Sequence, residues 1–344
     1  MAAVLNGYYD IPTGSNFTPH HTNTTSLIMA TDYIIFIHGV NTRKKDFFEK
    51  QAMNMFAQIK KNVNSDLRNL KPVILFWGDI AEKSIDFLLY GLDKSPTWEE
   101  FRFREFREQQ VINFVGDAVL YLSRNVSVQM INQMTVQALD HMELTLDQLK
   151  SMSPKDGDRL HLVTHSWGAV ILFDIMFAAR WEDETLDESI RQSVNNIRTG
   201  FFGVGNSDIK NCGIPIASIH TMGSPISLFN LLNASGAKSF NLTPKLKDLL
   251  SSLHIETGKP LPWCNYAHPG DPIAYPLKGV MDLSLGEARD FVKINDIVTN
   301  TFSLIPKESL LHILRGGDAH SSYWNERSVI KNIGDVIKDV NRLG

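Results

Sequence analysis

The chain has 344 residues, a formal net charge of −4 and 43% hydrophobic residues. This length suits one large α/β domain or two small ones, and the apolar content is enough for a sizeable core. The slight negative charge provides no general attraction to nucleic acid, so we set nucleic-acid binding aside. Two cysteines in such a chain make no disulfide framework, and no CxxC motif or His/Cys cluster suggests a metal site.

Export and membrane signals are not evident in the sequence. The first residues lack a basic start followed by an apolar segment of export length, and no apolar run approaches about 18 residues. We therefore expect a cytoplasmic protein without a transmembrane segment, while peripheral contact with a membrane stays open. Residues 1–30 are polar and contain Pro12 and Gly14, which predicts an irregular N-terminal arm rather than a domain.

Short apolar runs typical of buried parallel strands alternate with segments of helical periodicity. The predicted strands are Tyr33–Ile37, Pro72–Gly78, Leu160–Val163, Ile214–Met222, Leu261–Tyr266 and Leu310–Leu314. The predicted helices outside the long insertion are Asp46–Asn62, the segment after Ser166, Thr243–Leu253 and Tyr323–Arg342. Trp181–Asn211 is charged and then glycine-rich, and we interpret it as a surface excursion. The alternation predicts one doubly wound, mostly parallel sheet in a single domain over residues 31–344.

An insertion lies between the second and third predicted strands. About 80 residues separate them, from Asp79 to Asp158, whereas a whole strand-helix-strand unit needs only about 30. Helical periodicity recurs at Ile85–Leu92, Phe101–Val119 and Val128–Met152. We place the helical insertion at about residues 80–126.

Two apolar patterns in this region have different interpretations. A stripe at every fourth residue is typical of ordinary core facing the sheet; it contains Met130, Met134, Ala138, Met142 and Leu146. Four aromatic residues either line a pocket as a helical cap or pack a surplus helix pair on the body. They are Phe101, Phe103, Phe106 and Phe114.

The segment Arg159–Trp181 predicts a buried strand, a tight turn and a helix. The turn is Thr164-His165-Ser166-Trp167-Gly168. A serine there is either a helix N-cap or a nucleophile raised above the carboxyl edge of the sheet, and the five residues alone favour neither. The rest of the chain has to decide between these functions.

Three side chains follow predicted strands and should meet at the carboxyl edge of the sheet: Ser166, Asp271 and His320. A serine hydroxyl needs a base to accept its proton, and the base needs an acid to orient its ring and stabilise its charge. The competing acid is Asp318, which lies two residues before His320 and is more typical of a loop-shaping residue. The competing bases are His38, His165 and His268. Asp79 either edges the pocket or caps a helix.

With these motifs the chain resembles the α/β-hydrolase superfamily, in particular its lipase-like and esterase-like serine hydrolases. The matching segments are FIHGVN (36–41), LVTHSWG (162–168), TMGSPI (221–226), WCNYAHPGDPIAY (263–275) and GDAHSSYW (317–324). The resemblance implies an α/β-hydrolase fold with a reduced sheet of about six strands flanked by helices. Thr164 departs from the glycine that is usual at its position in the turn.

Position by position, the resemblance implies Ser166 as nucleophile, Asp271 as acid and His320 as base. It also implies an oxyanion hole formed by the backbone N–H groups of Val40 and Trp167. Residues suggested for the substrate pocket are His38, Asn41, Phe103 and Phe106. No metal ion or cofactor is expected.

The expected reaction is hydrolysis of a carboxylic ester, with a small-molecule or lipid-like acyl ester as substrate. The same triad could serve a thioesterase, an amidase or an acyltransferase, which differ in leaving group or acceptor. A different hypothesis is a non-catalytic, hydrolase-like interaction scaffold. The sequence leaves the physiological substrate and the oligomeric state undetermined.

Overall fold

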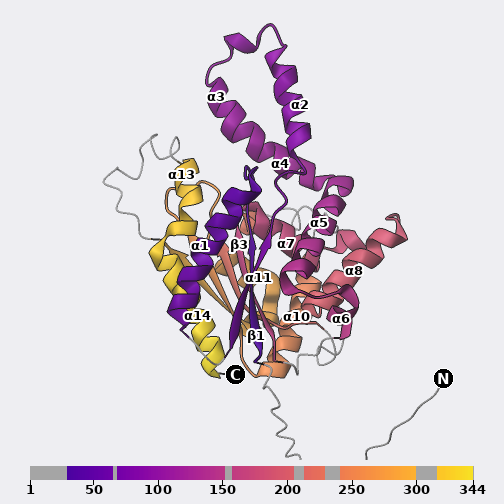
Figure 1. Cartoon of the computed structure of the whole chain (residues 1–344), viewed down its shortest axis with the longest axis vertical. Helices are drawn as coiled ribbons and strands as arrows, with labels where there is room; N and C mark the ends of the chain where they lie inside the picture. Colours follow the sequence, from indigo (N-terminus) through magenta and orange to yellow (C-terminus); the bar gives the residue numbers. More distant parts are fainter. Residues whose placement is uncertain are drawn as a thin grey trace, which may run out of the picture.

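A six-stranded parallel sheet runs through the part of the chain that the structure describes, with helices on both faces (Figure 1). The computed structural model describes residues 29–64, 68–151, 157–204, 213–228, 241–299 and 316–343. The strands are β1 (Thr31–Ile37), β2 (Asn69–Leu75), β3 (Arg159–His165), β4 (Ile216–Met222), β5 (Leu261–Ala267) and β6 (Val292–Val298). Their order is β2-β1-β3-β4-β5-β6, and every neighbouring pair is parallel. The predicted α/β class is therefore confirmed.

The strands are apolar because both faces of the sheet are covered. In β1 all seven residues are buried. Ile34 and Phe36 pack into one apolar cluster, while Ile35 and Ile37 pack into another on the opposite face, as the two-residue repeat of a strand requires. The sheet thus separates two hydrophobic layers.

Different helices cover the two faces (Figure 1). Helix α1 (Lys45–Val63) and helix α14 (Arg327–Leu343) lie side by side against one face. The other face is covered by α5 (Arg124–Met142), α7 (Trp167–Phe177), α8 (Glu188–Phe202), α10 (Thr243–Thr257) and α11 (Lys278–Leu285). Shorter helical elements are α6 (Leu146–Ser151), η4 (Ala179–Glu182), η7 (Gly286–Phe291), α13 (Gly316–Ser321) and η8 (Ser322–Asn325).

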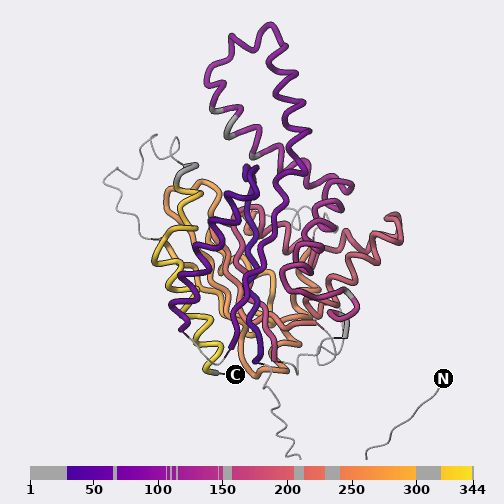
Figure 2. Tube along the Cα trace, viewed as in Figure 1, coloured from indigo at the N-terminus to yellow at the C-terminus, as the bar shows by residue number. Residues whose placement is uncertain are grey.

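The insertion after β2 begins with a helical hairpin that projects from the body of the molecule (Figures 1 and 2). Its elements are α2 (Glu82–Asp93), η1 (Trp98–Glu100), α3 (Arg104–Phe106), the π-helix η2 (Arg107–Ile112) and α4 (Asn113–Leu122). We call residues 82–122 the hairpin. The chain then returns to the sheet through α5, whose Met130, Met134, Ala138 and Met142 are buried in the core, as predicted.

The base of the hairpin lies at the carboxyl edge of the sheet. Asp117 in α4 bonds to the loop that follows β1, and Gln133 in α5 bonds to the carbonyl of Phe76, just after β2. Gln137 also accepts the N–H of Phe76 and donates to its carbonyl, at distances of 2.7 and 3.0 Å. Because β2 is the edge strand, these amides satisfy backbone groups that no neighbouring strand could pair.

The predicted elements differ from the structure at several described places, among them α11, which was not predicted, and α13, where a turn was predicted. Strand β2 ends at Leu75, three residues before the predicted Gly78. The segment predicted as a surface excursion contains α8, whose Val194, Ile197, Phe201 and Phe202 are buried. Their helical spacing was present in the sequence, but the charged and glycine residues around it favoured a loop.

Strand β6 was missed. Its sequence VKINDIV carries charged and amide side chains, and only Val292 and Ile294 are buried, as is typical of an edge strand. The predicted strand at 310–314 and almost all of the predicted arm at 1–30 lie outside the described residues.

Candidate active site

Ser166 occupies a strained turn between β3 and α7. Its backbone dihedrals are φ 53° and ψ −128°, in a region that favours glycine, so the surrounding structure must hold this serine in place. The turn is held by a bond from Ser166 N–H to the carbonyl of Met222 at 2.9 Å and by one from Ala169 N–H to the carbonyl of Ser166 at 3.2 Å. Such a turn raises a side chain above the carboxyl edge of a sheet.

The loop after β1 crosses this turn at very short range. A Cβ atom added to Gly39 would lie 2.3 Å from the Cβ of Ser166, and one added to Gly168 would lie 2.4 Å from the carbonyl oxygen of His38. Real side chains do not approach so closely, so both positions require glycine. The two glycines therefore bring the loop of His38, Gly39 and Val40 against Ser166.

His320 and Asp271 form the acid–base pair of the candidate site. The Nδ1–H of His320, on α13, donates to Oδ2 of Asp271, in the loop after β5, at 2.8 Å. Tyr323 also donates its hydroxyl to this oxygen at 2.8 Å, and the N–H of Ile273 donates to Oδ1 at 3.0 Å. Burial alone would raise the pKa of Asp271, but the bonds from His320, Ile273 and Tyr323 hold that pKa below its usual value. The carboxylate is thus charged at neutral pH.

The ring of His320 is held beside the turn by the residue before Ser166. The Nε2–H of His165 donates to the carbonyl of His320 at 2.6 Å, and the two ring centres are 4.7 Å apart. Tyr323 ties in the loop after β5, because its hydroxyl accepts the N–H of His268 and donates to Asp271. Segments far apart in the sequence are therefore locked together at one edge of the sheet.

Within the described part of the chain, the side chains of Ser166 and His320 each leave one polar atom without a hydrogen bond at this edge. Among the described residues, Ser166 Oγ and His320 Nε2 are both buried and have no hydrogen-bond partner. Buried polar atoms are nearly always paired, so an unpaired serine oxygen and an unpaired imidazole nitrogen at one edge make these two residues candidates for a catalytic role. These are the atoms that a serine nucleophile and its base would use. The hydrogen bond between a catalytic serine and its base is often long in the absence of substrate.

The competing histidines have other partners. His38 donates from Nδ1 to the carbonyl of Gly39 at 2.6 Å and accepts the N–H of Trp77 at Nε2, and its ring is stacked on that of Trp77. Burial lowers the pKa of His38 to about 3 and that of His165 to about 3, so both rings are neutral at pH 7. His268 accepts the N–H of Gly270 at Nδ1. The side chain of the competing acid Asp318 lies outside the described part of the structure.

The residues suggested for the oxyanion hole are both near Ser166 along the chain or through a neighbouring residue. Trp167 is the first residue of α7, where backbone N–H groups have no partner within the helix. Val40 is buried and follows Gly39, which touches Ser166. Thr164, the departure from the usual glycine, is fully buried and its hydroxyl donates to the carbonyl of His220 at 3.4 Å.

The residues suggested for the substrate pocket do not gather in one place. His38 is buried and stacked on Trp77, Asn41 follows Val40, and Phe103 is 74% exposed in the hairpin. The side chain of Phe106 lies outside the described part of the structure. None of the described contacts joins Phe103 to Ser166, Asp271 or His320.

Two residues of the site were missed in the sequence. Tyr323 and Asp117 bond to Asp271 and to the loop after β1, respectively. A signal existed for Asp117, because it is the one carboxylate within the apolar run NFVGDAVLYL. A lone charge in such a run is expected to have a buried partner.

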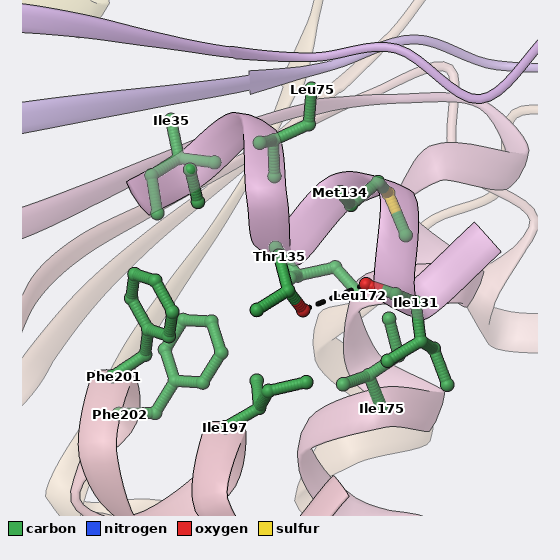
Figure 3. A pocket seen from close by; sticks show the side chains of 11 residues that line it. Ile35, Leu75, Ile131, Met134, Thr135, Leu172, Ile175, Ile197, Phe201 and Phe202 are labelled. Carbon is green, nitrogen blue, oxygen red and sulfur yellow. Dashed lines mark hydrogen bonds between the residues drawn. The ribbon is translucent and has the colours of Figure 1, made fainter. Parts of the chain in front are cut away.

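An apolar cavity of about 40 Å³ lies away from these residues, between α5, α7, α8 and the sheet (Figure 3). Its lining includes Ile35, Leu172 and Phe201 but not Ser166, Asp271 or His320. The hydroxyl of Thr135 turns to the carbonyl of Ile131 in its own helix. Pockets for small molecules measure about 300–1,000 Å³, so this void is a gap in core packing.

Among the described residues, no group of three or more His, Cys, Asp or Glu side chains could hold a metal ion. No helix among them has the length and apolar character needed to cross a membrane. In comparisons with known proteins, the sequence matches no family model and no curated relative was found.

Proposed function

We propose that this chain is a serine hydrolase with an α/β-hydrolase fold that cleaves a carboxylic ester. One observation carries the proposal: Ser166 Oγ and His320 Nε2 are buried and unpaired at the sheet edge where His320 is bonded to Asp271. The chain order Ser, Asp, His is the order associated with α/β-hydrolases. The parallel sheet and the strained turn at Ser166 support the same proposal.

In the proposed mechanism, Ser166 Oγ attacks the ester carbonyl carbon while its proton passes to His320 Nε2. Asp271 keeps the His320 ring oriented with Nδ1 protonated and stabilises the imidazolium that forms. The negative oxygen of the tetrahedral intermediate is bound by the N–H groups of Val40 and Trp167, and losing one such donor typically costs about 2.7–4 kcal/mol. His320 returns the proton to the departing alcohol, which leaves an acyl-enzyme on Ser166. Water then attacks that ester with His320 as base, releases the acid and restores the serine.

The substrate class that we favour has an apolar acyl group. Half of the large apolar side chains that are exposed in the described structure belong to the hairpin. They are Phe87, Leu88, Tyr90, Phe101, Phe103, Val111, Val115, Val119 and Leu122. Exposed apolar residues gathered in this way mark sites of contact with a ligand, a partner or a membrane. This group lies on the hairpin whose helix α4 bonds to the loop after β1.

The proposal is tested with a fluorophosphonate probe, which reacts with an activated serine. We expect the folded wild type to be labelled, Ser166→Ala to be unlabelled, and His320→Gln to be labelled far more slowly. A folded wild type that stays unlabelled would support the scaffold hypothesis instead. If labelling succeeds, p-nitrophenyl esters of increasing acyl length test the substrate class, and matched thioester and amide substrates test the other leaving groups.

A further inference from the structure

We propose that Asp117, at the base of the hairpin, is a positioning residue: by bonding to the N–H of Asn41 it holds the loop whose Val40 N–H binds the oxyanion. This inference rests on the proposed function. It assigns the hairpin a role in transition-state stabilisation in addition to contact with substrate.

Both carboxylate oxygens of Asp117 accept hydrogen bonds. Its side chain is fully buried, and Oδ2 accepts the N–H of Asn41 at 2.8 Å. Oδ1 accepts from Nη2 of Arg43 at 2.8 Å, and Nη1 of Arg43 donates to the carbonyl of Gly78 at 3.1 Å. One carboxylate therefore ties α4 to the loop after β1, and through Arg43 to the segment that follows β2.

The bond to Asn41 matters because the backbone there is strained. Asn41 has φ 60°, in the left-handed region that most residues avoid. A hydrogen bond that a backbone N–H donates to a carboxylate is charge-assisted and about twice as strong as a neutral one. If this bond is removed, we expect the φ angle of Asn41 to relax toward negative values. That change would rotate the peptide unit between Val40 and Asn41.

Val40 is held on both sides, by two different residues. The peptide unit that carries its N–H also carries the carbonyl of Gly39, which accepts from Nδ1 of His38 at 2.6 Å. In a trans peptide the N–H and C=O groups point in opposite directions, so this bond aims the N–H of Val40 away from the His38 ring. Asp117 holds the following peptide unit. Because His38 directly follows β1 and Asp117 belongs to the insertion, the orientation of one donor depends on both parts of the molecule.

A merely structural anchor would have the same contacts, so the test needs a matched control. The control is Asp174, a second fully buried carboxylate paired with an arginine. Its Oδ2 accepts from Arg180 and from Tyr121, the latter at the end of α4. It thus anchors the same helix, and none of its described bonds reaches the loop after β1.

The experiment compares Asp117→Ala, Asp117→Asn and Asp174→Asn in the full chain. The rate of fluorophosphonate labelling, kcat and KM for one ester, and the melting temperature are measured for each. We expect Asp117→Ala to reduce the labelling rate and kcat about 10- to 100-fold with little change in KM, which is below the loss of a whole oxyanion donor. Asp117→Asn keeps an oxygen that can accept the N–H of Asn41, and we expect a loss below about tenfold. Asp174→Asn should lower the melting temperature without slowing the labelling of the folded fraction.

Equal slowing in the Asp117 and Asp174 variants would overturn the inference, as would wild-type rates in folded Asp117→Ala. If Asp117→Ala does not fold, Asp117→Asn decides: a rate indistinguishable from that of Asp174→Asn overturns the inference, and a slower one supports it. These results differ from a failure of the proposed function, in which the wild type itself is never labelled.

Discussion

The carboxyl edge of the sheet and the hairpin above it are built in opposite ways. At the edge, Asp271, His320 and His165 are bonded to one another in a chain, and glycines allow backbones to touch. In the hairpin, apolar side chains such as Phe87 and Phe103 are 80% and 74% exposed. The positions of the side chains at the edge are fixed by these bonds and close contacts. In the hairpin, by contrast, many apolar side chains are exposed to solvent. Substitutions at the edge should therefore abolish chemistry, while those on the hairpin should change which substrates are used.

The largest effect is expected at Ser166. Ser166→Ala removes the proposed nucleophile, and we expect kcat for a p-nitrophenyl ester to fall at least about 10⁴-fold. Because φ and ψ at this position favour glycine, Ser166→Gly should melt at a higher temperature than Ser166→Ala while remaining equally inactive. Residual ester cleavage near the wild-type rate in either variant would contradict the role of Ser166.

Asp271 should come next. Asp271→Asn replaces the acceptor that fixes the ring of His320, and we expect kcat to fall by up to about 10⁴-fold. Initial rates with the same ester measure this loss. A decrease below about fivefold would show that Asp271 does not orient the base.

The same carboxylate makes a prediction about pH. The pKa of Asp271 is lower in the folded protein, so its ionised form stabilises the fold above its unfolded pKa of about 3.9. As the pH falls below that value and through the lowered folded pKa, this contribution is lost. Denaturant unfolding of wild type and Asp271→Asn at several pH values should give free energies of unfolding that converge on acidification. A difference that stays constant from pH 7 to pH 3 would contradict this assignment.

Two glycines, one at the sheet edge and one in the hairpin, should respond oppositely to substitution by alanine. Gly39→Ala places a methyl group against Ser166, and we expect it to lower the free energy of unfolding by about 1–3 kcal/mol or more. In the hairpin, an added Cβ at Gly91 in α2 meets nothing within 4 Å. Gly91→Ala should therefore stabilise the protein by up to about 1 kcal/mol, because alanine is the better helix former. Urea unfolding of both variants would refute the contrast if the two shifts had the same sign.

The smallest effects are expected on the exposed face of α4. Val115→Ser and Val119→Ser should change the free energy of unfolding by no more than about 0.5 kcal/mol, since both side chains are exposed. We expect KM for long-chain esters to rise a few-fold while KM for acetate esters stays constant. Ile85→Ala, at a buried position of α2, is the matched control and should cost about 2–5 kcal/mol. Equal changes in KM for short and long esters would argue against acyl contact on this face.

Local pattern was enough for much of the fold. The predicted helix 46–62 agrees with α1 to within one residue at each end, because its apolar face recurs at helical spacing. Strand β6 was missed since an edge strand buries few of its side chains, and α8 was missed because polar residues surround its apolar face. In each case the local signal was weakened by partial exposure, which depends on neighbours distant in the chain.

By itself the sequence determined the parallel α/β class and singled out Ser166, Asp271 and His320, because strand and helix periods and the order of motifs are local or countable properties. Only the tertiary structure decided which groups touch. His320 and Asp271 are 49 residues apart, and Asn41 and Asp117 are 76 apart. Bonds across such separations exist only after the sheet has packed, since the contacts that order these groups come from the packed helices and strands around them. The unpaired serine and imidazole atoms, and the carboxylate that ties the hairpin to the loop after β1, are properties of that packing.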